Sequence, residues 1–262
     1  MKPRIPATVI TGFLGAGKTS LLRHLVAKAN GTRIALVINE FGELGIDREL
    51  LLGCGVEGCD DENVIELANG CICCTVADDF LPTIEALLAR DPAPDHIVIE
   101  TSGLALPKPL VKAFAWPEVR SRVTVDGVIA VIDAAAVAAG RFADDLEALA
   151  AQRAADPTLD HDNPLEEVFE DQLQCADLIV LNKTDLVGSD TLAGLVHEIG
   201  GRVRPGAKLV QARFGALDPK ALLGIGAAAE DDLASRKSHA DLEGEHDHED
   251  FESFVVPLGA RS

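Results

Sequence analysis

The stretch Gly12-Phe-Leu-Gly-Ala-Gly-Lys-Thr19 constrains the fold of this chain more than any other feature. It follows a short β-branched run, Thr8–Ile10, and precedes an apolar pattern of helical period from Leu21 to Ala29. A glycine-rich turn between a strand and a helix presents backbone N–H groups and a helix N-terminus, and both favour bound phosphate. The sequence therefore predicts a P-loop at the first strand–helix connection of an α/β domain.

The P-loop residues have distinct expected roles. We expect phosphate oxygens to be surrounded by Gly12, Phe13, Leu14, Gly15, Ala16, Gly17, Lys18, Thr19 and Ser20. Lys18 should reach the β- and γ-phosphates, and the Thr19 hydroxyl should bind Mg²⁺. A chance glycine turn is the alternative, and the complete pattern in its strand–helix context argues against it.

Short apolar runs recur along the chain with helical patterns between them. The clearest predicted strands are 34–38, 97–99, 128–132 and 178–181, with weaker candidates at 64–67 and 208–211 and a second helical pattern at 83–89. Strands that are apolar on both faces belong to a sheet covered on both sides. We therefore predict a P-loop NTPase fold, α/β, with a mostly parallel sheet flanked by helices. Ligands bind at the carboxyl ends of such strands, where the distinctive polar residues of this chain also lie.

Asn182-Lys-Thr-Asp185 follows one of these strands and predicts guanine selectivity. The Asp185 carboxylate can accept two hydrogen bonds from a guanine edge, and adenine does not present that pair of donors. Lys183 should cover the plane of the base, and Asn182 should brace the loops. An ordinary turn is the alternative.

Glu100-Thr-Ser-Gly103 follows the strand 97–99. Glu100 can hold the Mg²⁺ shell or orient the attacking water, and Gly103 gives backbone access to the γ-phosphate. A helix N-cap by Thr101 or Ser102 is the alternative. The polar segment 39–42 and Asp47 are candidates for a nucleotide-sensing switch, or a plain polar loop.

Five of the six cysteines fall between Cys54 and Cys74. Cys71, Cys73 and Cys74 form a C-x-C-C run whose thiolates suit Zn²⁺, Co²⁺ or Cu⁺. A redox pair and buried structural cysteines are the alternatives. Cys54 and Cys59 are a weaker thiol pair that a glycine-rich loop explains equally well. The sixth cysteine, Cys175, precedes a strand and is expected in the core.

Charge and hydropathy exclude several classes of protein. The formal charge of -20 disfavours nucleic-acid binding, because the phosphate backbone is repelled. The sequence has no run of about 18 apolar residues, which argues against a membrane span. It also lacks a signal-peptide pattern at its start. A cytoplasmic location is the expectation.

Composition changes towards the C-terminus predict three parts. Residues 1–225 form the P-loop domain with its cysteine loop, residues 226–250 an acidic solvated linker, and residues 251–262 the first strand of an incomplete C-terminal domain. The linker carries His239, His246 and His248 among its carboxylates. These histidines could collect metal loosely, but a solvated linker is the favoured interpretation.

Several motifs together resemble the CobW family of metallochaperone GTPases. They are Ile10–Thr19, Asn39–Gly42, Asn69–Cys74, Glu100–Gly103 and Asn182–Asp185, and Pro117–Gly127 and Asp171–Asp177 are similar to the CobW subgroup. The similarity covers roughly residues 5 to 225.

The resemblance implies a GTPase that binds Mg²⁺ and GTP. From the residues we expect Lys18 and Glu100 to act in catalysis, and hydrolysis to be slow because no cis arginine finger can be assigned. The resemblance also implies a metal site at Cys71, Cys73 and Cys74, with metal delivery tied to hydrolysis. The CobW subgroup is associated with Co²⁺ for the corrin ring of cobalamin, which implies a cobalt-chelating complex as partner. Related members supply Zn²⁺ to client metalloproteins. Family members usually carry a second domain after the linker, and the partner recognition assigned to it lies beyond this resemblance.

Other classes remain open from the residues alone. A regulatory GTPase with structural cysteines would bind nucleotide without any effect of metal. A small-molecule kinase would share the P-loop, but Asn182–Asp185 argues against an adenine donor. Our hypothesis for the metallochaperone is that Mg²⁺–GTP orders the loop of Cys71–Cys74.

Overall fold

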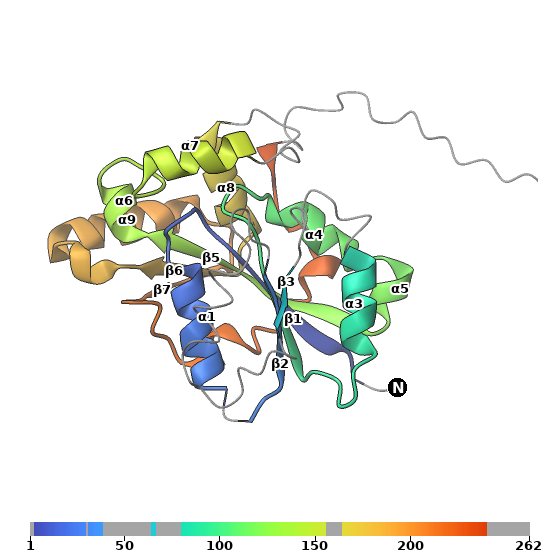
Figure 1. Cartoon of the computed structure of the whole chain (residues 1–262). Helices are drawn as coiled ribbons and strands as arrows, with labels where there is room; N and C mark the ends of the chain where they lie inside the picture. Colours follow the sequence, from blue (N-terminus) through green and yellow to red (C-terminus); the bar gives the residue numbers. More distant parts are fainter. Residues whose placement is uncertain (1–2, 30, 39–63, 67–79, 156–163, 240–262) are drawn as a thin grey trace, which may run out of the picture.

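The structure is a computed structural model, which describes residues 3–29, 31–38, 64–66, 80–155 and 164–239 (Figure 1). Its described strands form one seven-stranded sheet in the order β3-β2-β4-β1-β5-β6-β7. The strands are β1 Ile5–Thr11, β2 Ile34–Ile38, β3 Val64–Glu66, β4 His96–Glu100, β5 Val123–Asp133, β6 Leu178–Asn182 and β7 Lys208–Gln211. Each pairing is parallel, so all the carboxyl ends of the strands meet at one edge.

The helices connect consecutive strands and cover both faces of the sheet (Figure 1). They are α1 Lys18–Ala27, α3 Leu81–Leu88, α4 Pro107–Ala113, α5 Pro117–Arg120, α6 Ala134–Ala138, α7 Leu146–Ala155, α8 Leu165–Cys175, α9 Ser189–Arg202 and α10 Pro219–Leu222. Three short 3-10 turns are η3 Thr184–Leu186, η4 Ala229–Asp231 and η5 Leu233–Ser235. No helix of the described part is long and apolar enough to cross a membrane.

The alternating side chains of β5 show how the core is divided between the two faces. Ile129 and Val131 pack with α1 and α10, whereas Ala130 and Ile132 pack with α8 and α9. Successive side chains of a strand point to opposite faces, and both faces here are covered by helices. This explains why the central strands are mostly apolar on both faces. It confirms the predicted parallel sheet flanked by helices.

The strand predictions from sequence agree closely with the structure, except at the starts of β1 and β5. Strand β1 begins at Ile5, three residues before the predicted start at Thr8. Strand β5 begins at Val123, five residues before the predicted start at Val128. Thr124 and Asp126 interrupt the apolar run, and both turn out to bind the C-terminal segment: Thr124 donates to Glu230, and Asp126 accepts backbone N–H groups. A polar residue in the strand therefore has a partner far along the chain.

The first part of the predicted linker, residues 226–239, packs against the domain instead of being solvated. Asp126 accepts hydrogen bonds from the backbone N–H groups of residues 224, 225 and 226, at 2.7, 3.0 and 2.9 Å. Glu230, 3% exposed, accepts from Arg4, Thr124 and the backbone N–H of Val125. These carboxylates are buried because they have several donors each. The boundary predicted at residue 225 is therefore wrong for this segment.

Arg236 is the deepest anchor of this segment, with a fully buried side chain. Its guanidinium group donates to both oxygens of Asp177, at 3.1 and 2.9 Å, and to the backbone oxygen of Cys175. Arg204 also pairs with Asp177. Three residues after Arg236, His239 donates its backbone N–H to Asp171 at 2.9 Å, and its ring lies at the same distance from that carboxylate. Residues 240–262, with the remaining linker and the predicted last strand, lie outside the described residues.

Candidate functional site

The P-loop connects β1 to α1 at the carboxyl edge of the sheet, as predicted. Gly12 and Gly17 have φ values of +138° and +100°, which L-residues with a Cβ rarely adopt. A Cβ at Gly12 would lie 2.2 Å from the backbone oxygen of Val131, and one at Gly17 would lie 2.3 Å from Asn182 Nδ2. Only glycine therefore fits either position, which explains the spacing of the motif.

The N-terminus of α1 is left open towards this loop. Gly17 is its N-cap, no side chain caps the helix, and its first turn contains no acidic residue. The first N–H groups of a helix have no acceptor within the helix and carry positive partial charge. Backbone donors from Lys18, Thr19 and Ser20 are therefore suited to an anion such as phosphate.

Lys18 lies across the P-loop. It is 8% exposed, its Nζ donates to the backbone oxygens of Gly12 at 2.8 Å and Phe13 at 3.5 Å, and it lies 3.8 Å from Glu100 Oε1. Glu100 ends β4, the strand beside β1, and is 5% exposed. Parallel pairing therefore brings the predicted phosphate-binding lysine and the predicted catalytic carboxylate together.

The segment after Glu100 runs along the P-loop instead of capping a helix. The backbone N–H of Thr101 donates to the oxygen of Ile10 at 2.9 Å, and a Cβ at Gly103 would lie 2.8 Å from the backbone nitrogen of Leu14. The next helix, α4, starts only at Pro107, with Leu106 as its N-cap. The alternative role of Thr101 or Ser102 as an N-cap is therefore wrong.

Asn182, at the end of β6, joins two loops. It is 1% exposed, its Nδ2 donates to the backbone oxygen of Ala16 at 2.9 Å, and its Oδ1 accepts from the backbone N–H of Gly215 at 3.0 Å. One side chain thus connects the P-loop to the turn that follows β7. The predicted bracing position of Asn182 agrees with these contacts.

Lys183 and Asp185 lie beyond that brace. Lys183 has a φ of +57°, and its amino group pairs with Asp133, which ends β5 and is 2% exposed. Asp133 also accepts from the backbone N–H groups of Ala135 and Ala136, both at 3.0 Å, and so caps α6. Asp185 lies in η3 with its side chain exposed. A base at this edge would therefore meet an oriented lysine and an open carboxylate.

The donor set also fits Mg²⁺, which prefers hard oxygen ligands together with nucleotide phosphates. The hydroxyl of Thr19 stands in the first turn of α1, and Glu100 supplies a carboxylate beside Lys18. The predicted thiol residues Cys54, Cys59, Cys71, Cys73 and Cys74, the segment 39–42, Asp47, His246 and His248 lie outside the described residues. Cys175 is buried, as predicted, and burial raises the pKa of its thiol to about 12.

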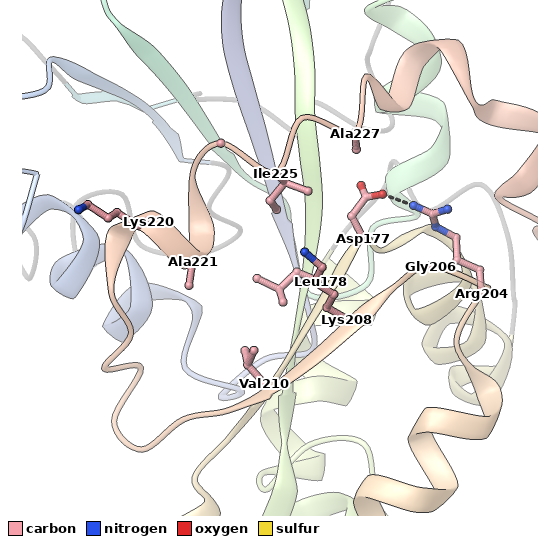
Figure 2. A pocket seen from close by; sticks show the side chains of 11 residues that line it. Asp177, Leu178, Arg204, Gly206, Lys208, Val210, Lys220, Ala221, Ile225 and Ala227 are labelled. Carbon is pink, nitrogen blue, oxygen red and sulfur yellow. Dashed lines mark hydrogen bonds and ion pairs between the residues drawn. The ribbon is translucent and has the colours of Figure 1, made fainter.

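A cavity of about 480 Å³ lies elsewhere, at the amino ends of β6 and β7 (Figure 2). Leu178 and Lys208, the first residues of those strands, line it together with Ile225 from the C-terminal segment. Figure 2 also shows the ion pair between Arg204 and Asp177. Because the P-loop follows the carboxyl end of β1, this cavity is not part of the nucleotide site.

Comparison with known proteins identifies the domain. The family described as CobW/HypB/UreG, nucleotide-binding domain, matches residues 6–211. The chain belongs to this family. Both the family and the braced P-loop make it a P-loop GTPase, confirming the fold and activity expected from sequence.

Individual relatives extend beyond this chain. It is 57% identical over 261 residues to the zinc chaperone CobW of a Sinorhizobium species, covering 98% of this chain and 74% of that protein. The Pseudomonas aeruginosa zinc chaperone CobW is 53% identical over 250 residues, with coverages of 94% and 65%. The Zn(II)-bound YjiA GTPase from E. coli has a TM-score of 0.53 and 27% identity, covering 86% of this chain and 62% of that one.

Sequence reasoning gave no role to two features of the site. Asp133 is a single polar residue at the end of a strand and belongs to no recognisable motif, but the structure pairs it with Lys183. The turn at residues 213–216 has Gly215 as its sequence signal, which indicates a tight turn but no contact with the nucleotide site. Both depend on contacts between residues that are far apart in sequence.

Proposed function

We propose that this GTPase couples GTP binding and hydrolysis to the delivery of a divalent metal held by Cys71, Cys73 and Cys74. Zn²⁺ is the first candidate cargo, because two relatives more than 50% identical are named zinc chaperones. Co²⁺ for cobalamin biosynthesis is the second, on the resemblance to the CobW subgroup. The observation that carries the proposal is a C-x-C-C run following a strand of the sheet that also carries the braced P-loop.

The nucleotide half of the proposal assigns roles to the described residues. Lys18 and the open N-terminus of α1 bind the phosphates, and Asp185 accepts the guanine donors. Thr19 and Glu100 would hold Mg²⁺, which neutralises charge on the phosphate oxygens when bound. The position of Glu100 at the end of the strand beside the P-loop strand supports a role in orienting the attacking water.

The sheet geometry supports coupling over a short distance. Strand β3 is the third neighbour of β1, through β2 and β4, so their carboxyl ends lie about 14 Å apart at a strand spacing of about 4.8 Å. Cys71 follows the end of β3 at Glu66 by five residues, which can span at most about 18 Å. The length of chain after β3 is therefore sufficient for Cys71 to reach the carboxyl end of β1, where the P-loop begins.

Delivery requires that nucleotide changes the affinity of the thiols for metal. A ligand shifts an equilibrium only through different affinities for the two states, and the coupling must be reciprocal. Bound metal must then change the affinity for GTP by the same factor as GTP changes the affinity for metal. This reciprocity distinguishes a chaperone cycle from two independent sites.

The test is an anaerobic titration with Co²⁺, followed by thiolate-to-metal absorption, and by competition with Zn²⁺. It is done with Mg²⁺–GTP, with Mg²⁺–GDP and without nucleotide. We expect tighter binding with GTP, and no thiolate bands in the Cys73→Ser/Cys74→Ser variant. The matched control is Cys175→Ala, which removes a buried thiol and should leave the titration unchanged.

Two outcomes would contradict the proposal. Equal affinity in all three nucleotide states would leave a GTPase without metal gating. Thiolate bands that survive in the double variant would place the metal elsewhere. The ratio of Zn²⁺ to Co²⁺ affinity then separates the two cargoes, and pull-down with the GTP-bound form tests for a client metalloprotein or a cobalt-chelating complex.

A further inference from the structure

The turn after β7 holds an aromatic residue in an unfavourable position. Residues 213–216 form a tight turn in which the Ala216 N–H donates to the Arg213 oxygen at 2.9 Å. Its two central residues, Phe214 and Gly215, have φ values of +55° and +68°. Glycine adopts this left-handed region without cost, but a bulky side chain rarely does.

Phe214 is also 71% exposed. The backbone of Phe214 is strained and its ring is exposed to water. Packing against the described part of the chain therefore does not offset the strain. Strained residues of this kind concentrate at ligand-binding sites, where the surrounding structure holds them in place. Leu186, next to Asp185, is exposed to 66%, so two of the three large exposed apolar residues in the described part belong to this region.

The turn is held against the guanine motif from both sides. The N–H and hydroxyl of Thr184 both donate to the backbone oxygen of Ala212, at 3.2 and 2.9 Å. Asn182 accepts the N–H of Gly215 at 3.0 Å. A Cβ at Gly215 would lie 2.5 Å from the backbone nitrogen of Leu21 in α1. Phe214 is therefore fixed between contacts to the two motifs that bind the base and the phosphates.

We propose that the Phe214 ring stacks on the purine of bound GTP and GDP. The inference rests on the guanine site assigned above and adds a second residue, besides Lys183, that covers the base. Base–aromatic stacking contributes about 5- to 150-fold in affinity per base, and it tolerates any purine because every base has a π face. Asp185 therefore selects guanine, whereas Phe214 contributes affinity for the base without selecting it.

The first experiment compares Phe214→Ala with wild type in binding Mg²⁺–GTP, Mg²⁺–GDP and Mg²⁺–tripolyphosphate by calorimetry. We expect both nucleotides to bind about tenfold more weakly, and tripolyphosphate, which lacks a base, to bind unchanged. Leu146→Ala is the matched control, since Leu146 is an exposed apolar residue at the start of α7. Nucleotide affinities within twofold of wild type would overturn the proposal and indicate that Phe214 is covered by protein instead.

A second variant separates stacking from strain. Asparagine adopts the left-handed conformation far more readily than phenylalanine, so Phe214→Asn should raise the urea midpoint of the nucleotide-free protein. It should nevertheless bind GDP about tenfold more weakly. Stability and affinity that fall together, or affinity that does not fall, would refute a role in stacking.

Nucleotide binding by wild type also separates a failure of the stacking role from a failure of the guanine assignment on which it rests. If wild type shows no preference for GTP over ATP, the guanine assignment itself fails. If wild type prefers GTP and Phe214→Ala binds it equally well, only the stacking role fails.

Discussion

Replacing Arg236 by methionine tests whether the C-terminal segment is part of the folded domain. Arg236 is fully buried and binds both oxygens of Asp177 as well as the backbone oxygen of Cys175. Methionine keeps most of the apolar contacts of the side chain but removes all these hydrogen bonds. The variant therefore reports on the buried ion pair more than on packing.

The expected loss of stability depends on the partners that Asp177 retains in the variant. Removing one partner of a buried ion pair costs about 3–5 kcal/mol when the remaining charge is uncompensated. Asp177 retains Arg204 and the N–H of Val128, so the lower end of that range applies. The Cys175 carbonyl also loses a donor, at about 1 kcal/mol or more. We expect the free energy of unfolding to fall by about 3–4 kcal/mol.

The assay is urea denaturation followed by circular dichroism at neutral pH. With a slope of about 3 kcal/mol per molar urea, the midpoint should fall by about 1 M. Lys237→Met is the matched control, because it removes the same charge from the neighbouring exposed position and should change stability by less than about 0.5 kcal/mol. A loss below 1 kcal/mol in Arg236→Met, with an unchanged slope, would refute the anchoring role of this segment.

Four further predictions concern the site and the core. Asn182→Ala leaves two buried backbone groups without partners, so urea denaturation should show a loss of about 2–3 kcal/mol; wild-type stability would contradict the brace. Gly12→Ala places a Cβ 2.2 Å from the Val131 oxygen, so calorimetry should detect no GTP binding, and wild-type affinity would disprove the required conformation. Glu100→Gln should lower the rate of GTP hydrolysis about 100-fold while the GDP affinity changes less than threefold, and an unchanged rate would exclude its catalytic role. Burial lowers the pKa of His96, so the unfolded chain binds a proton below about pH 6.5 before the folded one does; stability should fall from pH 7 towards pH 5, and His96→Gln should flatten that slope.

Much of the fold could be predicted because its signals are local. Strand β2 has the predicted bounds, since a continuous apolar run marks a strand buried on both faces. Strand β7 also has the predicted bounds, although it lies at the edge of the sheet and none of its residues is buried. The P-loop and the Asn182–Asp185 motif could be recognised because each is short and lies directly after a strand. Parallel pairing then brings them to one edge without any further information.

The remaining features depend on contacts between distant residues. Glu230 and Arg236 lie in a charged run that is typical of a solvated linker, yet their partners are Thr124 and Asp177, 106 and 59 residues away. No local pattern reveals such pairs. The exposed ring of Phe214 is similarly invisible in sequence, because neither its left-handed backbone nor its exposure can be read from the residue type.

The brace between the P-loop and Asn182 has a consequence for synthesis of the protein. The P-loop is synthesised well before its partners, because Asn182 lies 166 residues after Ala16 and Gly215 follows later still. At about 5–20 residues per second, roughly 10–40 s separate the loop from its last neighbours. Arg236 follows later still, and with it the contacts that fix the start of β6. We therefore expect a nascent chain to bind nucleotide only after Asn182, Gly215 and Arg236 have been synthesised, so that a product truncated before these residues would not bind nucleotide.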